Sequence, residues 1–155
     1  MLLISEFNEE ISIIHEAKEG SKNLYIEGIF LQSDVENGNK RIYPSTILDE
    51  ETSRYIESKV KTNRAIGELN HPATPILNFE RASHRITELS KVGKNWAGKA
   101  IVLNTPMGTI VRGLIEGGVR IGVSSRGVGS IIKDRNGISI IQPDFRLVTA
   151  GDIVS

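Results

Sequence analysis

The chain has 155 residues, of which 39% are apolar, enough for one domain with a small hydrophobic core. Nineteen basic and nineteen acidic side chains cancel, so no long-range field attracts the protein to nucleic acid or to an anionic membrane. The absence of cysteine excludes thiol nucleophiles, disulfides and thiolate metal sites. No basic signal region and no apolar run of membrane-spanning length is present, so a soluble, intracellular protein is expected.

The N-terminal third of the chain predicts a strand and a helix after an ambiguous start. Residues 5–22 are polar and acidic around three isoleucines, which leaves a docked arm and a surface helix open as alternatives. Residues 24–31 are rich in β-forming residues and end before a turn signal, so they predict a buried strand. Residues 45–60 carry apolar side chains at helical spacing, which predicts a covering helix with Ser45 as its N-cap.

The middle of the chain predicts three strands. A short strand at 65–67 leads to His71, and Pro72 both stops a regular ladder and favours extended geometry at His71. Residues 83–93 and 95–103 predict two strands of a hairpin with a glycine-containing turn.

The C-terminal third predicts a capped helix followed by more strands. Thr105 and Pro106 suit the N-cap and first position of a helix that a pair of glycines closes. Residues 119–123 predict a strand that runs into a glycine-rich bend at 124–130. The remaining predicted strands are 131–133, 138–142 and roughly 145–154. About seven strands and two or three helices without strict βαβ alternation predict a single α+β domain on a mostly antiparallel sheet or barrel.

Ser124 and Ser125 are candidate nucleophiles because they lie where a strand meets glycine-rich backbone. Such a bend can fix an exposed hydroxyl while neighbouring N–H groups converge on one point, as in an oxyanion hole. A bend of this composition is more often only a turn, and beside Arg126 it also fits a phosphate cradle. No Lys-Ser/Thr phosphate-loop pattern accompanies it.

A serine nucleophile needs an adjacent base, and only three histidines are available. His71 lies next to a proline and is also compatible with a hydrogen-bonded turn residue that has no catalytic role. His84 lies in a charged stretch that is expected to face water, and His15 lies in the ambiguous N-terminal segment.

One carboxylate stands apart from the others. Asp152 interrupts an apolar strand end, where an acid needs a partner, and it fits either a residue that orients a histidine or one that bonds local backbone. Four further acids are expected on solvated faces: Asp34, Glu36, Glu50 and Glu51.

Four segments, in order along residues 24–155, resemble the prohead core proteases of T4-like tailed phages. They are LYIEGIF at 24–30, NKRIYP at 39–44, GELNHP at 67–72 and GVSSRGVGS at 122–130. The resemblance implies a fold similar to herpesvirus assemblin, a β-barrel wrapped by helices, with a serine nucleophile and a histidine base.

The resemblance also assigns roles to residues of this chain. The family histidine falls on His71, and the nucleophile falls on Ser124, with Ser125 as the alternative because a one-residue shift reverses strand facing. The third member falls on Asp152; assemblins use a second histidine there. The oxyanion is expected to be stabilised by backbone N–H groups of Ser125–Gly127, with help from Arg126.

The implied activity is serine endopeptidase cleavage after glutamate, inside the prohead in the host cytoplasm. The implied substrates are the scaffold core, the N-terminal segment of the capsid protein and the termini of the protease itself. A latent homo-oligomer is expected, with no cofactor, metal, nucleic acid or membrane. The alternative is a non-catalytic prohead assembly component. Because the chain ends inside an apparent apolar strand, the natural protein is expected to continue beyond Ser155.

Overall fold

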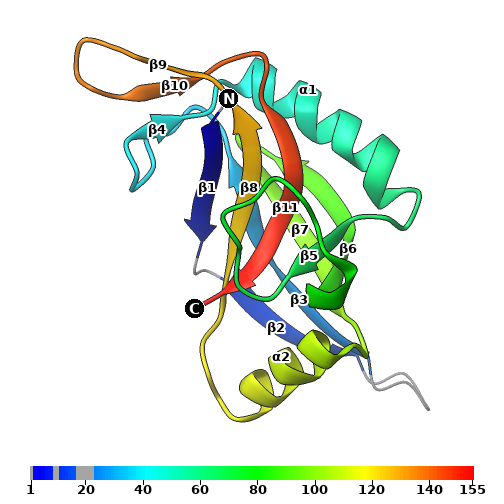
Figure 1. Ribbon diagram of the computed structural model, residues 1–155. Coiled ribbons are helices and arrows are strands. Elements are labelled where there is room, and N and C mark those ends of the chain that lie inside the picture. The colour runs from blue at the N-terminus through cyan, green and yellow to red at the C-terminus, as the bar shows by residue number, and fades with distance from the viewer. Residues whose placement is uncertain (1, 9–10, 17–22) are drawn as a thin grey trace.

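The computed structural model describes residues 2–8, 11–16 and 23–155, and it is rich in strands (Figure 1). The strands are β1 (Leu2–Asn8), β2 (Ile11–Glu16), β3 (Asn23–Gln32), β4 (Arg41–Ile42), β5 (Ile66–Glu68), β6 (Ala82–Val92), β7 (Asn95–Val102), β8 (Gly122–Gly129), β9 (Ile131–Lys133), β10 (Ser139–Ile141) and β11 (Arg146–Val154). The helices are α1 (Ser45–Tyr55), which continues as the π-helical turn η1 (Ile56–Val60), the 3₁₀ turn η2 (Phe79–Arg81) and α2 (Pro106–Glu116).

The strands form three hydrogen-bonded sheets. Their orders are β1-β8-β11, β4-β10-β9 and β2-β3-β7-β6-β5, and all pairs are antiparallel except β4 with β10. A parallel bridge between Leu69 and Ile153 links the end of β5 to β11. The α+β, mostly antiparallel prediction is confirmed. No closed ring of strands is found among the described residues, so the barrel is not confirmed.

The ambiguous N-terminal segment contributes strands to two different sheets. Residues 2–8 pair with β8, and residues 11–16 pair with β3, so the surface-helix alternative is wrong within these ranges. The rest of the segment lies outside the described residues. No helix in the described part of the chain is long and apolar enough to cross a membrane.

The long hairpin of β6 and β7 provides one wall of the hydrophobic core. Side chains of β7 alternate between intermediate exposure and burial, and Trp96, Ala100 and Val102 face inward. Gly98 lies on the same inward face, where an added Cβ would come within 2.4 Å of the Phe30 ring. The alternation is the signature of a strand with one buried face, and the hairpin prediction is confirmed.

Helix α1 is held by buried contacts that its sequence pattern does not reveal. Ser45 is not its N-cap: Pro44 occupies that position, and the Asp34 carboxylate accepts a hydrogen bond from the Ser45 N–H at 2.9 Å. Glu51, expected in solvent, is 3% exposed, and it accepts a hydrogen bond from the Leu147 N–H of β11 at 2.6 Å. The predicted solvation of Glu51 is therefore wrong, because its carboxylate ties α1 to β11.

Helix α2 begins as predicted. The Thr105 hydroxyl accepts a hydrogen bond from the Gly108 N–H at 3.0 Å, Pro106 opens the helix and Gly117 is its C-cap. Two glycines inside this helix differ in their surroundings. A Cβ at Gly108 would lie 1.8 Å from the Leu103 carbonyl oxygen, whereas a Cβ at Gly113 would meet nothing within 4 Å.

These two glycines give a matched test of the helix packing. Gly113→Ala should raise the free energy of unfolding by about 0.5–1 kcal/mol, because alanine loses less conformational entropy in a helix. Gly108→Ala should lower it by about 1–3 kcal/mol, because backbone must shift to admit the methyl group. Urea denaturation of both variants measures the two signs, and equal effects would contradict this packing.

Candidate active site

The candidate nucleophiles lie in a continuous strand, so the predicted bend at 124–130 is wrong. Strand β8 runs from Gly122 to Gly129 and is paired on one edge with β1 and on the other with β11. Its glycines serve close packing instead of turning: a Cβ at Gly127 would lie 2.6 Å from the Phe145 ring. Ser124 and Ser125 therefore occupy successive places in the middle strand of a sheet.

A bulge in β11 decides which side chains share a face with Ser124. Asp152 pairs with Ser124 and Thr149 pairs with Arg126, so three residue steps on β11 match two on β8. Directly paired residues point to the same face, and only an extra residue allows both pairs to do so. The bulge, at Ala150 and Gly151, thus places Asp152 on the face that carries Ser124 and Arg126.

Arg126 is fully buried, and its donors are directed at protein acceptors. Its Nε and Nη2 donate to the two carboxylate oxygens of Asp152 at 2.9 and 3.1 Å. Nη2 also donates to Glu68 at 3.3 Å, and Nη1 donates to the carbonyls of Thr74 and Ile76 at 2.8 and 3.4 Å. These contacts make Arg126 a buried structural cation and give no support to its expected help at an oxyanion site.

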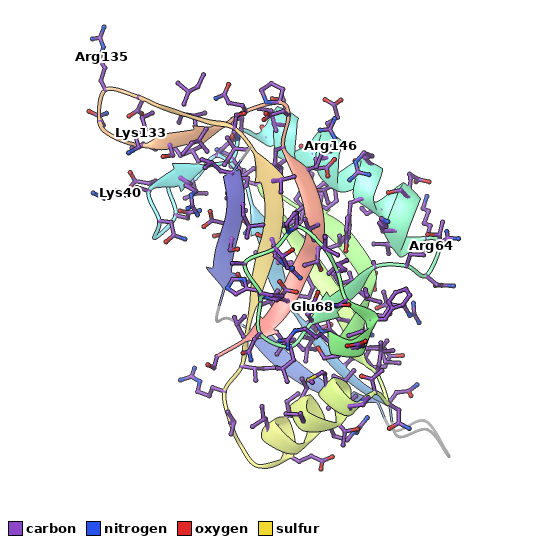
Figure 2. The ribbon with its side chains drawn as sticks, viewed as in Figure 1. Lys40, Arg64, Glu68, Lys133, Arg135 and Arg146 are labelled. Atoms are coloured by element: carbon purple, nitrogen blue, oxygen red, sulfur yellow. The ribbon has the colours of Figure 1, made fainter. Side chains whose placement is uncertain are left out.

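Glu68 is part of this cluster, and the sequence reasoning missed it. Its side chain is fully buried at the end of β5, and Figure 2 labels it in the interior of the molecule. The carboxylate accepts hydrogen bonds from the Asn78 N–H at 3.0 Å, from Arg126 and from Arg81 Nε at 3.2 Å. The sequence contained a signal for it, because Glu68 lies three residues before His71 in the segment GELNHP at 67–72, which resembles the family.

Asp152 has partners, as its place in an apolar strand end predicted. Its carboxylate is fully buried and accepts a hydrogen bond from the Glu68 N–H at 3.0 Å in addition to those from Arg126. Burial raises the pKa of Asp152, and the hydrogen bonds and charge of Arg126 offset part of that rise. The Nδ1 atom of His71 lies 3.9 Å from Asp152 Oδ2, outside hydrogen-bonding distance.

His71 is held beside β11 by the backbone that precedes it. Asn70 has a positive φ of 59° and donates its N–H to the Ile153 carbonyl at 2.8 Å, next to the bridge from Leu69 to Ile153. The His71 side chain is 33% exposed, and its buried Nδ1 has no hydrogen-bond partner among the described residues. The structure thus brings His71 near Asp152 but leaves their contact unmade.

Ser124 and Ser125 are both buried, at 1% and 3% exposure. The Ser124 hydroxyl lies 3.5 Å from the Ser125 carbonyl oxygen. Successive residues of a strand point to opposite faces, so Ser124 shares the face of Asp152 and Ser125 does not. Among the two candidate serines, this facing favours Ser124.

His84 is buried, so the prediction that it faces water is wrong. Its Nε2 donates to the Gly151 carbonyl at 2.6 Å, which leaves Nδ1 of the neutral ring to accept from the Ser83 hydroxyl at 2.7 Å. The Gly151 carbonyl belongs to the bulge beside Asp152. His84 is therefore a positioning residue for the bulge, and burial lowers its pKa to about 4.

This buried histidine predicts a loss of stability in acid. The unfolded chain takes up a proton at His84 near a pKa of about 6.5, whereas the folded chain does so only near about 4. The free energy of unfolding should therefore fall by about 3 kcal/mol as the pH drops through this window, and His84 should have no effect above it. Urea denaturation at several pH values between about 7 and about 4 measures the slope.

The control is His84→Gln, whose amide can still donate to the Gly151 carbonyl but does not titrate. Its stability should fall less steeply than that of the wild-type chain over the same pH window. Identical slopes for His84→Gln and the unchanged chain would assign the acid sensitivity to other groups.

Because Arg126 is a buried cation with buried acidic partners, we expect its removal to lower the stability of the protein strongly. Arg126→Met should lower the free energy of unfolding by about 3–5 kcal/mol, because Asp152 and Glu68 then stay buried without their shared partner. Arg81→Met is the matched control. Its side chain is 35% exposed, and it pairs with one carboxylate, that of Glu68, while its Nη2 donates to the Leu69 carbonyl at 2.5 Å, so about 1 kcal/mol is expected. Equal losses in urea denaturation would show that Arg126 has no central role.

Comparison with known proteins places this chain in a known family. Residues 8–155 match the family model described as prohead core protein serine protease. The chain is 38% identical over 133 residues to the prohead core protein protease of Enterobacteria phage T4, covering 84% of this chain and 63% of that protein. It is also similar to the solved structure of the bacteriophage T4 capsid assembly protease, gp21. That match has a TM-score of 0.93 and 35% identity, and it covers 99% of this chain and 96% of the other.

The chain spans less than two thirds of the T4 prohead core protein protease, while it accounts for nearly all of the solved gp21 chain. The family model covers the strand of Ser124, the loop of His71 and the bulge of Asp152. The chain therefore belongs to the prohead core protein serine protease family.

Proposed function

We propose that the protein is a serine endopeptidase that cuts scaffold and capsid proteins during maturation of a phage prohead, with Ser124, His71 and Asp152 as its catalytic residues. The observation that carries the proposal is the pairing of Asp152 with Ser124. The β11 bulge turns the Asp152 side chain to the same face of the sheet as Ser124, in a chain that belongs to this family. The Nδ1 atom of His71 lies 3.9 Å from Asp152 Oδ2.

The reaction in this proposal is acyl transfer. His71 removes the proton of the Ser124 hydroxyl as its oxygen attacks the scissile carbonyl, and it then protonates the leaving amine. Asp152 approaches Nδ1, so Nε2 is the nitrogen that exchanges the proton. A carboxylate at Nδ1 holds that tautomer and stabilises the imidazolium that forms.

Arg126 and Glu68 act in this proposal as positioning residues. Arg126 holds the Asp152 carboxylate through two hydrogen bonds and holds two carbonyls of the loop that follows His71. The backbone N–H groups of Ser125–Gly127 remain the proposed oxyanion donors. They lie in a strand paired on both edges, so those that face β1 become available when β1 separates from β8.

The described state is closed, in agreement with the proposed latency. Ser124 is 1% exposed, and the His71–Asp152 contact is too long for a hydrogen bond. A substrate carbonyl must touch the serine oxygen, so covering residues have to move first. Catalytic hydrogen bonds are often long in unliganded enzymes and tighten in the substrate complex.

The remaining parts of the proposal come from the family. They are cleavage after glutamate, processing of the protease's own termini, assembly as a homo-oligomer and a location inside the prohead in the host cytoplasm. The match to the T4 capsid assembly protease supports capsid and core proteins as the substrate class.

The test is co-expression of the chain with its cognate scaffold protein, with cleavage sites determined by intact-mass spectrometry. Ser124→Ala and His71→Gln should each reduce cleavage by about 10⁴-fold or more at unchanged thermal stability, because each removes a group that reacts. Ser125→Ala, at a serine of similar burial on the opposite face, is the matched control and should cut at nearly the normal rate.

Cleavage by the Ser124→Ala protein would move the nucleophile elsewhere. If the wild-type chain cuts neither the scaffold nor the capsid protein inside assembled proheads, the protease proposal fails and the non-catalytic assembly role takes its place.

A further inference from the structure

The carboxylate of Glu6, on the N-terminal strand β1, is held by four hydrogen-bond donors. Asn37 and Asn39 donate side-chain amides to Oε2 at 2.7 and 2.9 Å. Arg41 Nη1 and the Tyr43 hydroxyl donate to Oε1 at 2.7 and 3.0 Å. Each oxygen thus has two donors, and the side chain is 15% exposed. We call these four donor residues the carboxylate pocket.

The carboxylate pocket is held in shape mainly by contacts that do not involve β1. The Asn37 Oδ1 atom accepts from the N–H groups of Asn39 and Arg41 at 2.9 and 3.1 Å, which folds the segment into a tight loop. Tyr43 stacks edge-on against Phe145, and the following residues begin α1. Burial and the Glu6 charge raise the pKa of Tyr43, so its hydroxyl stays protonated as a donor. A pocket arranged in this way can receive a carboxylate from any segment that lies beside β8.

The strand that delivers Glu6 has a partner on one side alone among the described strands. Its residues pair antiparallel with β8, from Leu2 with Gly129 to Asn8 with Val123. Ile4, two residues before Glu6 and on the same face, is 2% exposed. The occupant is thus recognised by a backbone ladder, one buried apolar side chain and one carboxylate.

The geometry points to a peptide-binding site formed by the carboxylate pocket and the edge of β8 that β1 occupies, which takes an extended segment carrying glutamate. Residues 2–8 fill it in cis, and a glutamate-bearing segment of another chain exchanges with them by strand addition. A vacated β8 edge presents unpaired N–H and C=O groups, which are a template for an incoming strand. The binding itself does not depend on the proposed proteolysis.

The register of β1 on β8 places the occupant of this site next to the proposed nucleophile. Glu6 pairs with Ser125, and Phe7 pairs with Ser124. Whatever segment occupies the β8 edge therefore runs alongside the proposed nucleophile, and exchange of that segment changes what lies next to it.

The experiment measures binding of a fluorescent peptide with the sequence of residues 2–8 to the full-length chain by fluorescence anisotropy. The acceptor carries Ser124→Ala, so that no peptide is cut and the result is independent of the proposed function. A second acceptor adds Glu6→Ala, which weakens the strand in cis. The second acceptor should bind the peptide at least about tenfold more tightly than the first, because charge-assisted hydrogen bonds favour the glutamate of the peptide.

Two controls test the chemistry of the pocket. A peptide with glutamine in place of glutamate should bind at least about tenfold more weakly, and Arg41→Met in the acceptor should have a similar effect. Arg135→Met is the matched control, since Figure 2 shows Arg135 at the tip of the turn between β9 and β10, pointing away from the body of the molecule. Equal binding of the two peptides, or equal effects of the two arginine variants, would overturn the proposal.

A disulfide lock keeps the test decisive if Glu6→Ala fails to fold. The chain has no cysteine, and Leu3 pairs directly with Val128 across β1 and β8, so Leu3→Cys with Val128→Cys can be cross-linked. The oxidised chain should lose peptide binding and the reduced chain should regain it. Peptide binding that is the same in both states would show that the peptide does not replace β1.

Discussion

One buried guanidinium, that of Arg126, holds together the segments that form the candidate site. It joins β8 to the Asp152 carboxylate of β11, to Glu68 at the end of β5 and to two carbonyls of the loop after His71. A buried charge is tolerated only with its partners, and the loss of one partner leaves the others uncompensated. The strand of Ser124, the Asp152 carboxylate and the loop after His71 are therefore constrained through the same cation.

The bulge in β11 is the second constraint, and it depends on a residue that does no chemistry. Without an extra residue, Asp152 and Thr149 would point to opposite faces, and one of them would leave the Ser124 face. The bulge turns the Gly151 carbonyl toward the interior, where His84 donates to it. A neutral, buried imidazole satisfies this carbonyl without bringing a charge close to Asp152 and Arg126.

The sequence predicted the elements whose signal is local. Strand β7 and the Thr105 cap of α2 depend on neighbours within a few residues, and both were predicted correctly. The bend at 124–130 was wrong because glycine has two uses, and here the glycines make room for Phe145 instead of turning the chain. Glu51 was placed in solvent because its partner, the Leu147 N–H, is 96 residues away.

The sequence named the candidate catalytic residues of the site but not the residues that hold them in place. Motif resemblance singled out Ser124, His71 and Asp152, and the structure pairs Asp152 with Ser124 and brings His71 Nδ1 to 3.9 Å from Asp152. Glu68 and the buried role of Arg126 were not predicted, because a charged residue near a catalytic motif fits substrate binding as well as structure. Only the three-dimensional contacts distinguish these uses. The occupied β8 edge adds a quantitative condition. A strand tethered in cis competes at an effective concentration of order mM, so a segment in trans replaces β1 only where its own local concentration or its affinity is high enough. Exchange at this edge is thus favoured by assembly and disfavoured for the dilute chain.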